Sequence, residues 1–133
     1  MATLEVRRIP FEFGDDVPFV WNPRNVAFST FMNVVSVYAV AFEQMIVAAV
    51  REAIPLIDDD EVAREATEFL RQEAQHSACH RRHLKALVRH YPGLRQTFDD
   101  VIASFEEITD TKPLNYRLAY IADLEATFTP FFK

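Results

Sequence analysis

The chain has 133 residues, 50% of them hydrophobic, and its 14 basic and 20 acidic side chains give a formal net charge of −6. This composition predicts one packed domain over residues 1–133 and argues against a disordered chain. The acidic balance disfavours a nucleic-acid-binding surface, which needs clustered cations, and only two glycines disfavour a turn-rich all-β fold. The single cysteine, Cys79, allows no internal disulfide, and residues 1–13 lack the pattern of a secretory signal, so we expect a cytoplasmic protein.

The first 23 residues contain three of the seven prolines and show no sustained hydrophobic period. Because proline removes a backbone donor and opposes helix formation, we expect residues 1–23 to form an extended arm. Large aromatic side chains in this arm are expected to pack on the rest of the protein: Phe11, Phe13, Phe19 and Trp21.

The later prolines divide the rest of the chain into helical stretches. The acidic run 58–60 suits the N-cap and first turn of a second helix, the sequence Tyr91-Pro92-Gly93 ends it, and Pro113 suits the first position of the last helix. Short connections between long helices favour antiparallel neighbours. We therefore predict an all-α antiparallel bundle, with helices over residues 26–54, 59–91, 94–109 and 113–129.

One alternative concerns residues 26–50, where Glu43 is the only charged residue. A segment of this length and composition can span a membrane. Polar side chains such as Asn33, Ser36 and Gln44 would be costly in lipid, whereas a helix that is apolar on every side suits the centre of a bundle. We therefore predict a central bundle helix and no membrane span.

The second helix carries polar residues on its apolar face. At about 100° per residue, Glu73 and His80 fall in one stripe, and His76 lies just beside it. Burying an ionised carboxylate without a partner costs several kcal/mol or forces its protonation, so something must compensate Glu73. The apolar members of this stripe are Val62, Ala66, Phe69, Leu84, Leu87 and Tyr91.

Two other helices repeat the pattern, because Glu43 and Glu125 each lie within an apolar stripe. Converging glutamates repel one another unless a cation lies between them. Glu73 and His76 form an E-x-x-H pair, whose spacing aims both side chains at one point. We therefore predict a metal site formed by Glu43, Glu73, His76 and Glu125, with iron or manganese favoured by the carboxylate and imidazole donors and zinc as the competitor.

Each residue also has a plainer interpretation. Glu43 can be a buried acid paired with an arginine such as Arg117, and Glu125 a rim carboxylate near Lys112 or Arg117. His80 is either an additional ligand or a histidine that supports the ligands from behind, and His83 a solvated or hydrogen-bonded histidine. Cys79 lies off the stripe and is interpreted as a packing residue.

The arrangement resembles that of the ferritin-like di-iron carboxylate proteins, and more closely the bacterial family described as predicted metal-dependent hydrolases. The most specific motifs are QEAxH at residues 72–76 and LExxFT at residues 124–129. The resemblance implies a ferritin-like bundle with two iron ions, and ligand roles for Glu43, Glu73, His76 and Glu125; His80 matches a histidine that often follows in the family. It extends over VWNPRNVAFSTFMNVVS, FEQMIVAAVREAIPLIDD, FLRQEAQHSACHRRHLKAL and LAYIADLEATFTPFF.

Family members continue into another long helix with a second E-x-x-H, whereas this sequence stops at Lys133. The chain is then a fragment, or another polypeptide supplies the missing helix, or two copies together build the core. Phe128, Phe131 and Phe132 would form an exposed apolar end, so we expect a homodimer or a larger homo-oligomer.

The predicted function is that of a metal-dependent enzyme, a hydrolase or an oxygen-dependent oxidoreductase, acting on an apolar small molecule. An apolar substrate is suggested by side chains near the predicted site, among them Phe42, Met45, Phe69 and Phe128. The alternatives are a protein that binds or stores metal without turnover, and a structural bundle that keeps its glutamates as buried, hydrogen-bonded acids.

Overall fold

The computed structural model describes residues 6, 8 and 10–132, and every regular element within them is helical. The predicted all-α fold is therefore confirmed, and the long helices begin and end within two residues of their predicted positions. These elements are α1 (Val26–Ala53), η1 (Ile54–Leu56), α2 (Asp60–His90), α3 (Leu94–Thr111), α4 (Leu114–Phe128) and η2 (Thr129–Phe132).

The helix starts follow the capping rules. The Asp59 side chain accepts hydrogen bonds from the backbone amides of Glu61 at 2.8 Å and Val62 at 3.1 Å, so the predicted acidic cap of α2 is confirmed. Pro113 differs slightly from its prediction, because it is extended (ψ 159°) and precedes the first helical residue of α4. Its carbonyl accepts the first helical hydrogen bond, from the Arg117 amide at 3.1 Å.

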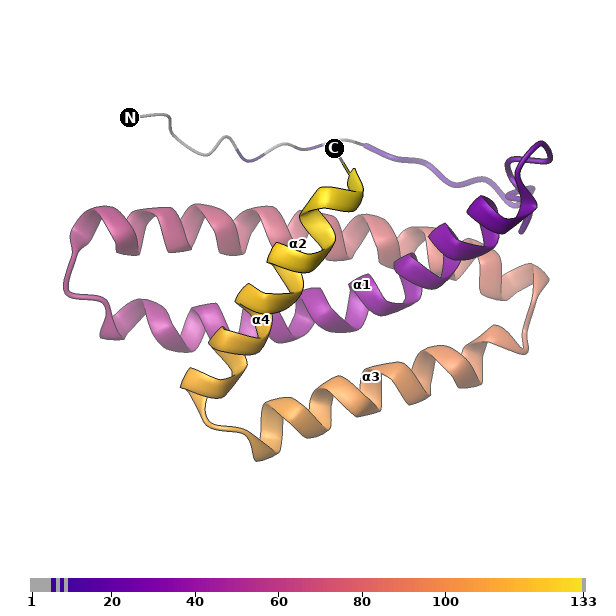
Figure 1. Cartoon of the computed structure of the whole chain (residues 1–133). Coiled ribbons are helices and arrows are strands. Elements are labelled where there is room, and N and C mark those ends of the chain that lie inside the picture. Colours follow the sequence, from indigo (N-terminus) through magenta and orange to yellow (C-terminus); the bar gives the residue numbers. More distant parts are fainter. Residues whose placement is uncertain (1–5, 7, 9, 133) are drawn as a thin grey trace.

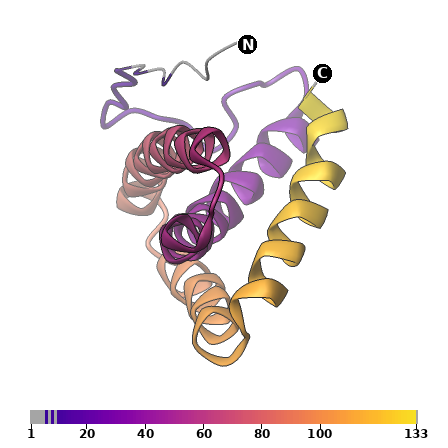
Figure 2. The same cartoon turned by 90° about the vertical axis from the view of Figure 1, so that its left-hand side faces the viewer.

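α1 is the central helix and contacts each of the other three (Figure 1). α2 lies antiparallel along its length, and α3 packs against α1 on another side. α4 crosses α1 obliquely instead of lying along it, as the end view makes clear (Figure 2). Ile121 of α4 is buried in this crossing, against a core that includes Ala41, Met45 and Ile46 of α1.

The central position of α1 explains its apolar composition. Together with η1 it is long and apolar enough to cross a membrane, but 61% of its most apolar window is buried inside the protein. Val40, Ile46 and Ala49 are fully buried, as is Leu87 of α2, which packs against Val40. This burial is the environment predicted for a central bundle helix, and it is compatible with a soluble protein.

The described part of the arm packs on the outside of α1 and α2, on the side away from α3 (Figures 1 and 2). Asn33, which is 3% exposed, donates from Nδ2 to the Phe19 carbonyl at 2.8 Å and accepts at Oδ1 from the Trp21 indole at 3.3 Å. The Phe13 ring lies 5.1 Å from that of His83. The predicted packing is therefore seen for Phe13, Phe19 and Trp21, whereas Phe11 is 47% exposed and its ring stacks on that of Phe13. Residues 1–5, 7 and 9 of the predicted arm lie outside the described residues.

A pair of leucines tests this core. Leu87 is fully buried, so Leu87→Ala should lower the free energy of unfolding by about 2–5 kcal/mol. Leu56 is 70% exposed in η1, and Leu56→Ala should change it by less than about 0.5 kcal/mol. Urea denaturation followed by circular dichroism measures both values, and equal effects would contradict the described packing.

Candidate metal site

Glu43 is a carboxylic acid in the interior of the protein. It is 6% exposed on the central helix, and its Oε2 atom is buried with no hydrogen-bond partner. Burial, followed by the nearby charges of Glu73 and Glu125, raises the pKa of Glu43 to about 9. The folded protein without a cation therefore keeps this carboxyl protonated at neutral pH, as expected for a buried acid that lacks a counter-charge.

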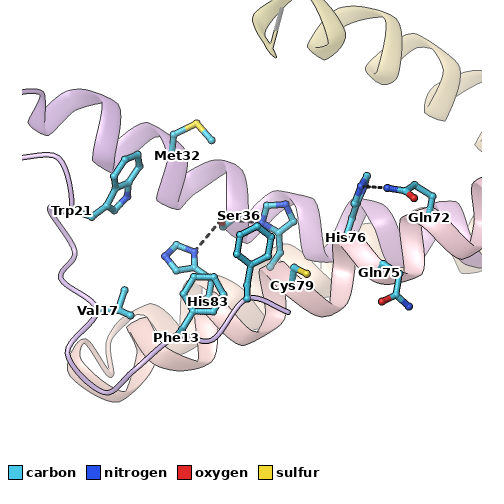
Figure 3. A pocket seen from close by; sticks show the side chains of 12 residues that line it. Phe13, Val17, Trp21, Met32, Ser36, Gln72, Gln75, His76, Cys79 and His83 are labelled. Carbon is cyan, nitrogen blue, oxygen red and sulfur yellow. Dashed lines mark hydrogen bonds between the residues drawn. The ribbon is translucent and has the colours of Figure 1, made fainter. Parts of the chain in front are cut away.

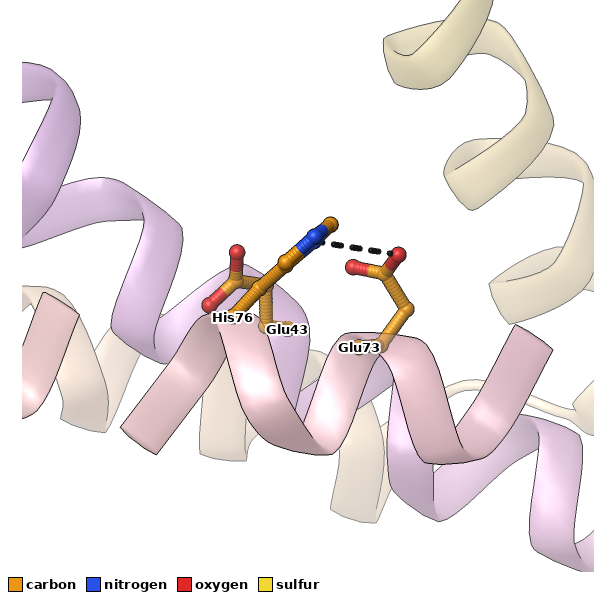
Figure 4. Close-up of side chains that lie close together, drawn as sticks. All are labelled: Glu43, Glu73 and His76. Carbon is orange, nitrogen blue, oxygen red and sulfur yellow. Dashed lines mark ion pairs between the residues drawn. The ribbon is translucent and has the colours of Figure 1, made fainter. Parts of the chain in front are cut away.

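Glu73 and His76 approach the same point from α2 (Figure 4). His76 Nδ1 lies 3.4 Å from Glu73 Oε1, and one donor atom each from Glu43, Glu73 and His76 lie within 4.8 Å of one another. The hydrogen bond with Glu73 raises the pKa of His76. The other ring nitrogen, Nε2, lies 2.7 Å from Gln72 Nε2. The E-x-x-H spacing thus brings a carboxylate and an imidazole together, as the sequence predicted.

Glu125 of α4 is partly buried and lies outside the cluster of three, but it interacts with that cluster electrostatically. Burial, and then the charge of Glu73, raise the pKa of Glu125, and Glu125 in turn contributes to the raised pKa values of Glu43 and His76. Acids from α1, α2 and α4 therefore share one electrostatic environment. Direct ligation by Glu125 stays a prediction.

His80 lies next to the cluster, between Glu43 and Ser36 of α1. Its Nε2 lies 3.9 Å from Glu43 Oε1, and its Nδ1 lies 3.1 Å from the Ser36 hydroxyl oxygen. The same hydroxyl lies 3.2 Å from His83 Nδ1, so Ser36 links the two imidazoles. Burial lowers the pKa of both histidines, with the neighbouring His76 and His83 charges adding to the shift of His80. Both rings are therefore neutral at pH 7.

The direction of the hydrogen bonds through Ser36 determines whether the His80 Nε2 atom that faces Glu43 carries a proton or a lone pair. If His83 donates to Ser36 and Ser36 donates to His80, then Nε2 of His80 carries a proton that faces the Glu43 carboxylate. In the opposite direction Nε2 presents a lone pair, which can bind a cation. The hydroxyl therefore allows either of the two roles predicted for His80.

The plainer interpretations of the acids involve cations that are engaged elsewhere. Arg117 donates to Glu52 Oε2 at 2.5 Å, and the Lys112 ammonium lies 5.7 Å from the centre of the Tyr116 ring. Among the residues that the structure describes, no ion pair joins Glu43 or Glu125 to a lysine or an arginine. The counter-charge that would compensate Glu43 is therefore missing from the described protein groups.

The donor set fits a divalent cation. Glu43 and Glu73 provide carboxylate oxygens, His76 provides an imidazole nitrogen, and the Glu43 Oε2 atom is buried without a partner. Oxygen and nitrogen donors of this kind suit iron, manganese or zinc. A cation would supply the counter-charge that Glu43 lacks in its buried position and would offset its repulsion by Glu73 and Glu125.

The link through Ser36 was not identified from the sequence, although the spacing contains its signal. Ser36 precedes Glu43 by seven residues, and His83 follows His76 by seven, so each pair lies on one helix face two turns apart. His83 had been expected to be solvated or hydrogen-bonded, and the second of these is correct. Which faces meet across two helices depends on their mutual rotation, which the period of one helix does not determine.

The raised pKa of Glu43 predicts a pH dependence of stability for the metal-free protein. Because the folded pKa is about 9 and the ordinary value is 4.5, this stabilising contribution is complete below pH 4.5 and is lost as the pH rises towards 9. The free energy of unfolding should fall by up to about 1.4 kcal/mol per pH unit in this window. Glu43→Gln removes the titration, so its stability should fall less steeply with pH.

Urea denaturation in the presence of a chelator, at several pH values, measures this difference. Glu65→Gln provides a matched control, because Glu65 is an exposed glutamate on α2, and its curve should follow that of the unaltered protein. Parallel curves for the unaltered protein and Glu43→Gln would show that Glu43 is not protonated in the fold.

Comparison with known proteins supports a role for metal. No curated protein and no solved structure matches the chain. The family model described as "Predicted metal-dependent hydrolase" matches residues 5–132, which is nearly the whole chain and includes every residue of the cluster. The chain therefore belongs to the family of predicted metal-dependent hydrolases.

Proposed function

We propose that the protein is a metal-dependent hydrolase whose cation is bound by Glu43, Glu73 and His76, with Glu125 as a further ligand. The observation that carries the proposal is the unpartnered Glu43 Oε2 atom, which is buried within reach of a second carboxylate and an imidazole. A bound cation supplies Lewis acidity and lowers the pKa of a bound water, which provides a nucleophile near neutral pH.

The protein groups have distinct roles in this proposal. Glu43 is closed off by the core and anchors the cation, whereas His76 is exposed and leaves its side of the donor set open to substrate. His80 and His83 are neutral imidazoles joined through Ser36, so they can accept a proton near the site. His80 Nε2 lies 3.9 Å from Glu43 Oε1, so in this proposal it is the nitrogen that would accept a proton from a water bound at the site.

Oxygen-dependent oxidation at two iron ions is the second candidate. This candidate is favoured by two further potential ligands near the cluster, which a second ion would need. His80 Nε2 lies 3.9 Å from Glu43 Oε1, and Glu125 on α4 interacts electrostatically with Glu43. Glu43 would then be shared between two ions, as in the ferritin-like di-iron carboxylate arrangement. Metal identity and stoichiometry separate the two candidates.

Elemental analysis of the purified protein tests the site. We expect one or two equivalents of iron, manganese or zinc per chain, and a loss of that metal in both Glu43→Gln and Glu73→Gln, because each removes a charged ligand. A ratio near two with iron favours the oxidative candidate. Addition of a chelator should lower the thermal stability of the unaltered protein and leave that of the two variants unchanged.

Glu65→Gln is again the control and should retain the full metal content. Trace metal at the same level in all four proteins, with no effect of chelator, would instead support a structural bundle without a metal site. Retained metal with no turnover of ester or amide substrates, and none with oxygen, would support a binding or storage protein.

The homodimer expected from the sequence stays a prediction, and an exposed apolar face of α1 supports it. Phe31, Val34 and Tyr38 on α1 are 49%, 48% and 52% exposed and lie on one face of the helix. Phe128 is also exposed, at 40%, while the side chains of Phe131 and Phe132 lie outside the described part. An apolar face of this kind marks a contact surface.

Light scattering after size-exclusion chromatography tests this prediction. We expect about twice the chain mass of 15.4 kDa, and the mass of one chain for Val34→Lys, because a buried charge opposes association. Val62→Lys alters an equally exposed valine at the start of α2 and should remain dimeric. A single-chain mass for the unaltered protein at every concentration would contradict the dimer.

A further inference from the structure

A cavity of about 570 Å³ lies between the arm and the α1–α2 pair (Figure 3). Its outer wall is formed by the arm, with Phe11, Phe13, Val17 and Trp21 facing the helices. This volume is in the range of pockets that enclose small organic molecules. The residues that had been expected to bind an apolar substrate, among them Phe42 and Met45, do not line it.

The inner wall connects the cavity to the cluster of acids. His76, His80 and His83 reach the cavity from α2, and Ser36 reaches it from α1. Of these, His76 belongs to the proposed metal site, so a molecule in the cavity can contact the open side of that site. The cavity therefore has an apolar outer wall and a polar inner wall, and the polar wall is the one next to the proposed cation.

The outer wall is held in place by hydrogen bonds from the helices. Buried Asn33 binds the Phe19 carbonyl and the Trp21 indole, and Ser29 Oγ accepts from the Asn22 amide at 2.8 Å. Further along the arm, Asp15 forms an ion pair with Arg89. The arm is therefore attached to the helices on both sides of Val17, by Asp15 and by Phe19, which fixes the position of this wall of the cavity.

The lining also restricts the charge of a ligand. Among the described residues that line the cavity there is no aspartate, glutamate, lysine or arginine. Along the wall formed by the arm, an ionic ligand would leave water without gaining a counter-charge, which is costly. An uncharged ligand loses little, and its apolar part gains the free energy of burial against the aromatic rings.

We propose that this cavity binds an uncharged, predominantly apolar small molecule, with its apolar body against Phe13, Val17 and Trp21 and its polar end against His76. The assignment of this molecule as the substrate rests on the proposed function, because His76 then belongs to the metal site. The cavity itself does not depend on a bound cation.

Fluorescence provides the test, because Trp21 is the only tryptophan in the chain and lines the cavity. N-phenyl-1-naphthylamine is an uncharged, apolar fluorophore that accepts energy from tryptophan, and 1-anilinonaphthalene-8-sulfonate has the same rings with an added negative charge. We expect saturable energy transfer from Trp21 to the uncharged probe, and at least about tenfold weaker binding of the anionic one.

Substitutions locate the binding. Val17→Phe fills the cavity from the arm and should weaken binding of the uncharged probe by about tenfold or more, whereas Val62→Phe, at an exposed position of α2, should not change it. Met32→Phe fills the same cavity from α1 and replaces Val17→Phe if that variant fails to fold by circular dichroism. No saturable transfer, equal affinity for both probes, or equal effects of Val17→Phe and Val62→Phe would overturn the proposal.

The same titration in Glu43→Gln separates this proposal from the metal site. If the variant has lost its metal and still binds the probe, the cavity and the site stand as two independent results. Metal content that behaves as proposed, combined with no probe binding, would overturn the cavity alone. Probe binding with no metal in any variant would leave the cavity as a binding site and overturn only the assignment of the ligand as substrate.

Discussion

The structure depends on one electrostatic constraint, which is that Glu43 is buried beside other acids without a protein counter-charge. α1 contacts all three other helices, and the side of α1 that carries Glu43 faces the interior. Among the described residues the nearest side chain that could carry a positive charge is His80, whose pKa is lowered by burial. Burial, and then the charges of Glu73 and Glu125, raise the pKa of Glu43 to about 9. A proton satisfies this carboxyl at low pH, and a cation would satisfy all the acids together. The burial of α1 that stabilises the bundle therefore also leaves the Glu43 carboxyl in need of a proton or a cation.

Much of this arrangement could be predicted from local sequence. Asp59 and the prolines define the helix ends, and the three-residue spacing of Glu73 and His76 sets their contact within one helix. The convergence of Glu43 on them followed from its place in an apolar stripe, because such a stripe must face another helix. These predictions succeed where the interaction is encoded by position along one helix or by burial of one face.

Other features depend on how separate segments are placed, and single-helix patterns do not contain that information. The oblique crossing of α4 is set by packing around Ile121 and by the Arg117–Glu52 ion pair. Asn33 of α1 holds the arm at Phe19 and Trp21, beside the cavity, whereas the sequence indicated only that Asn33 is unsuited to lipid. Aromatic residues in the arm were correctly expected to pack on the helices, but packing alone did not indicate that they enclose a space.

The histidines of α2 connect the two halves of the proposal. His76 and His80 lie one turn apart, and both contact the acids on one side and line the cavity on the other. The core closes the Glu43 side of the cluster, whereas His76 is exposed towards the cavity, so the donor set is accessible from one direction. A molecule in the cavity that contacts His76 also lies beside the aromatic side chains of the arm. In the proposed function, this wall would select for apolar character, and the cation would act at the other end of the cavity.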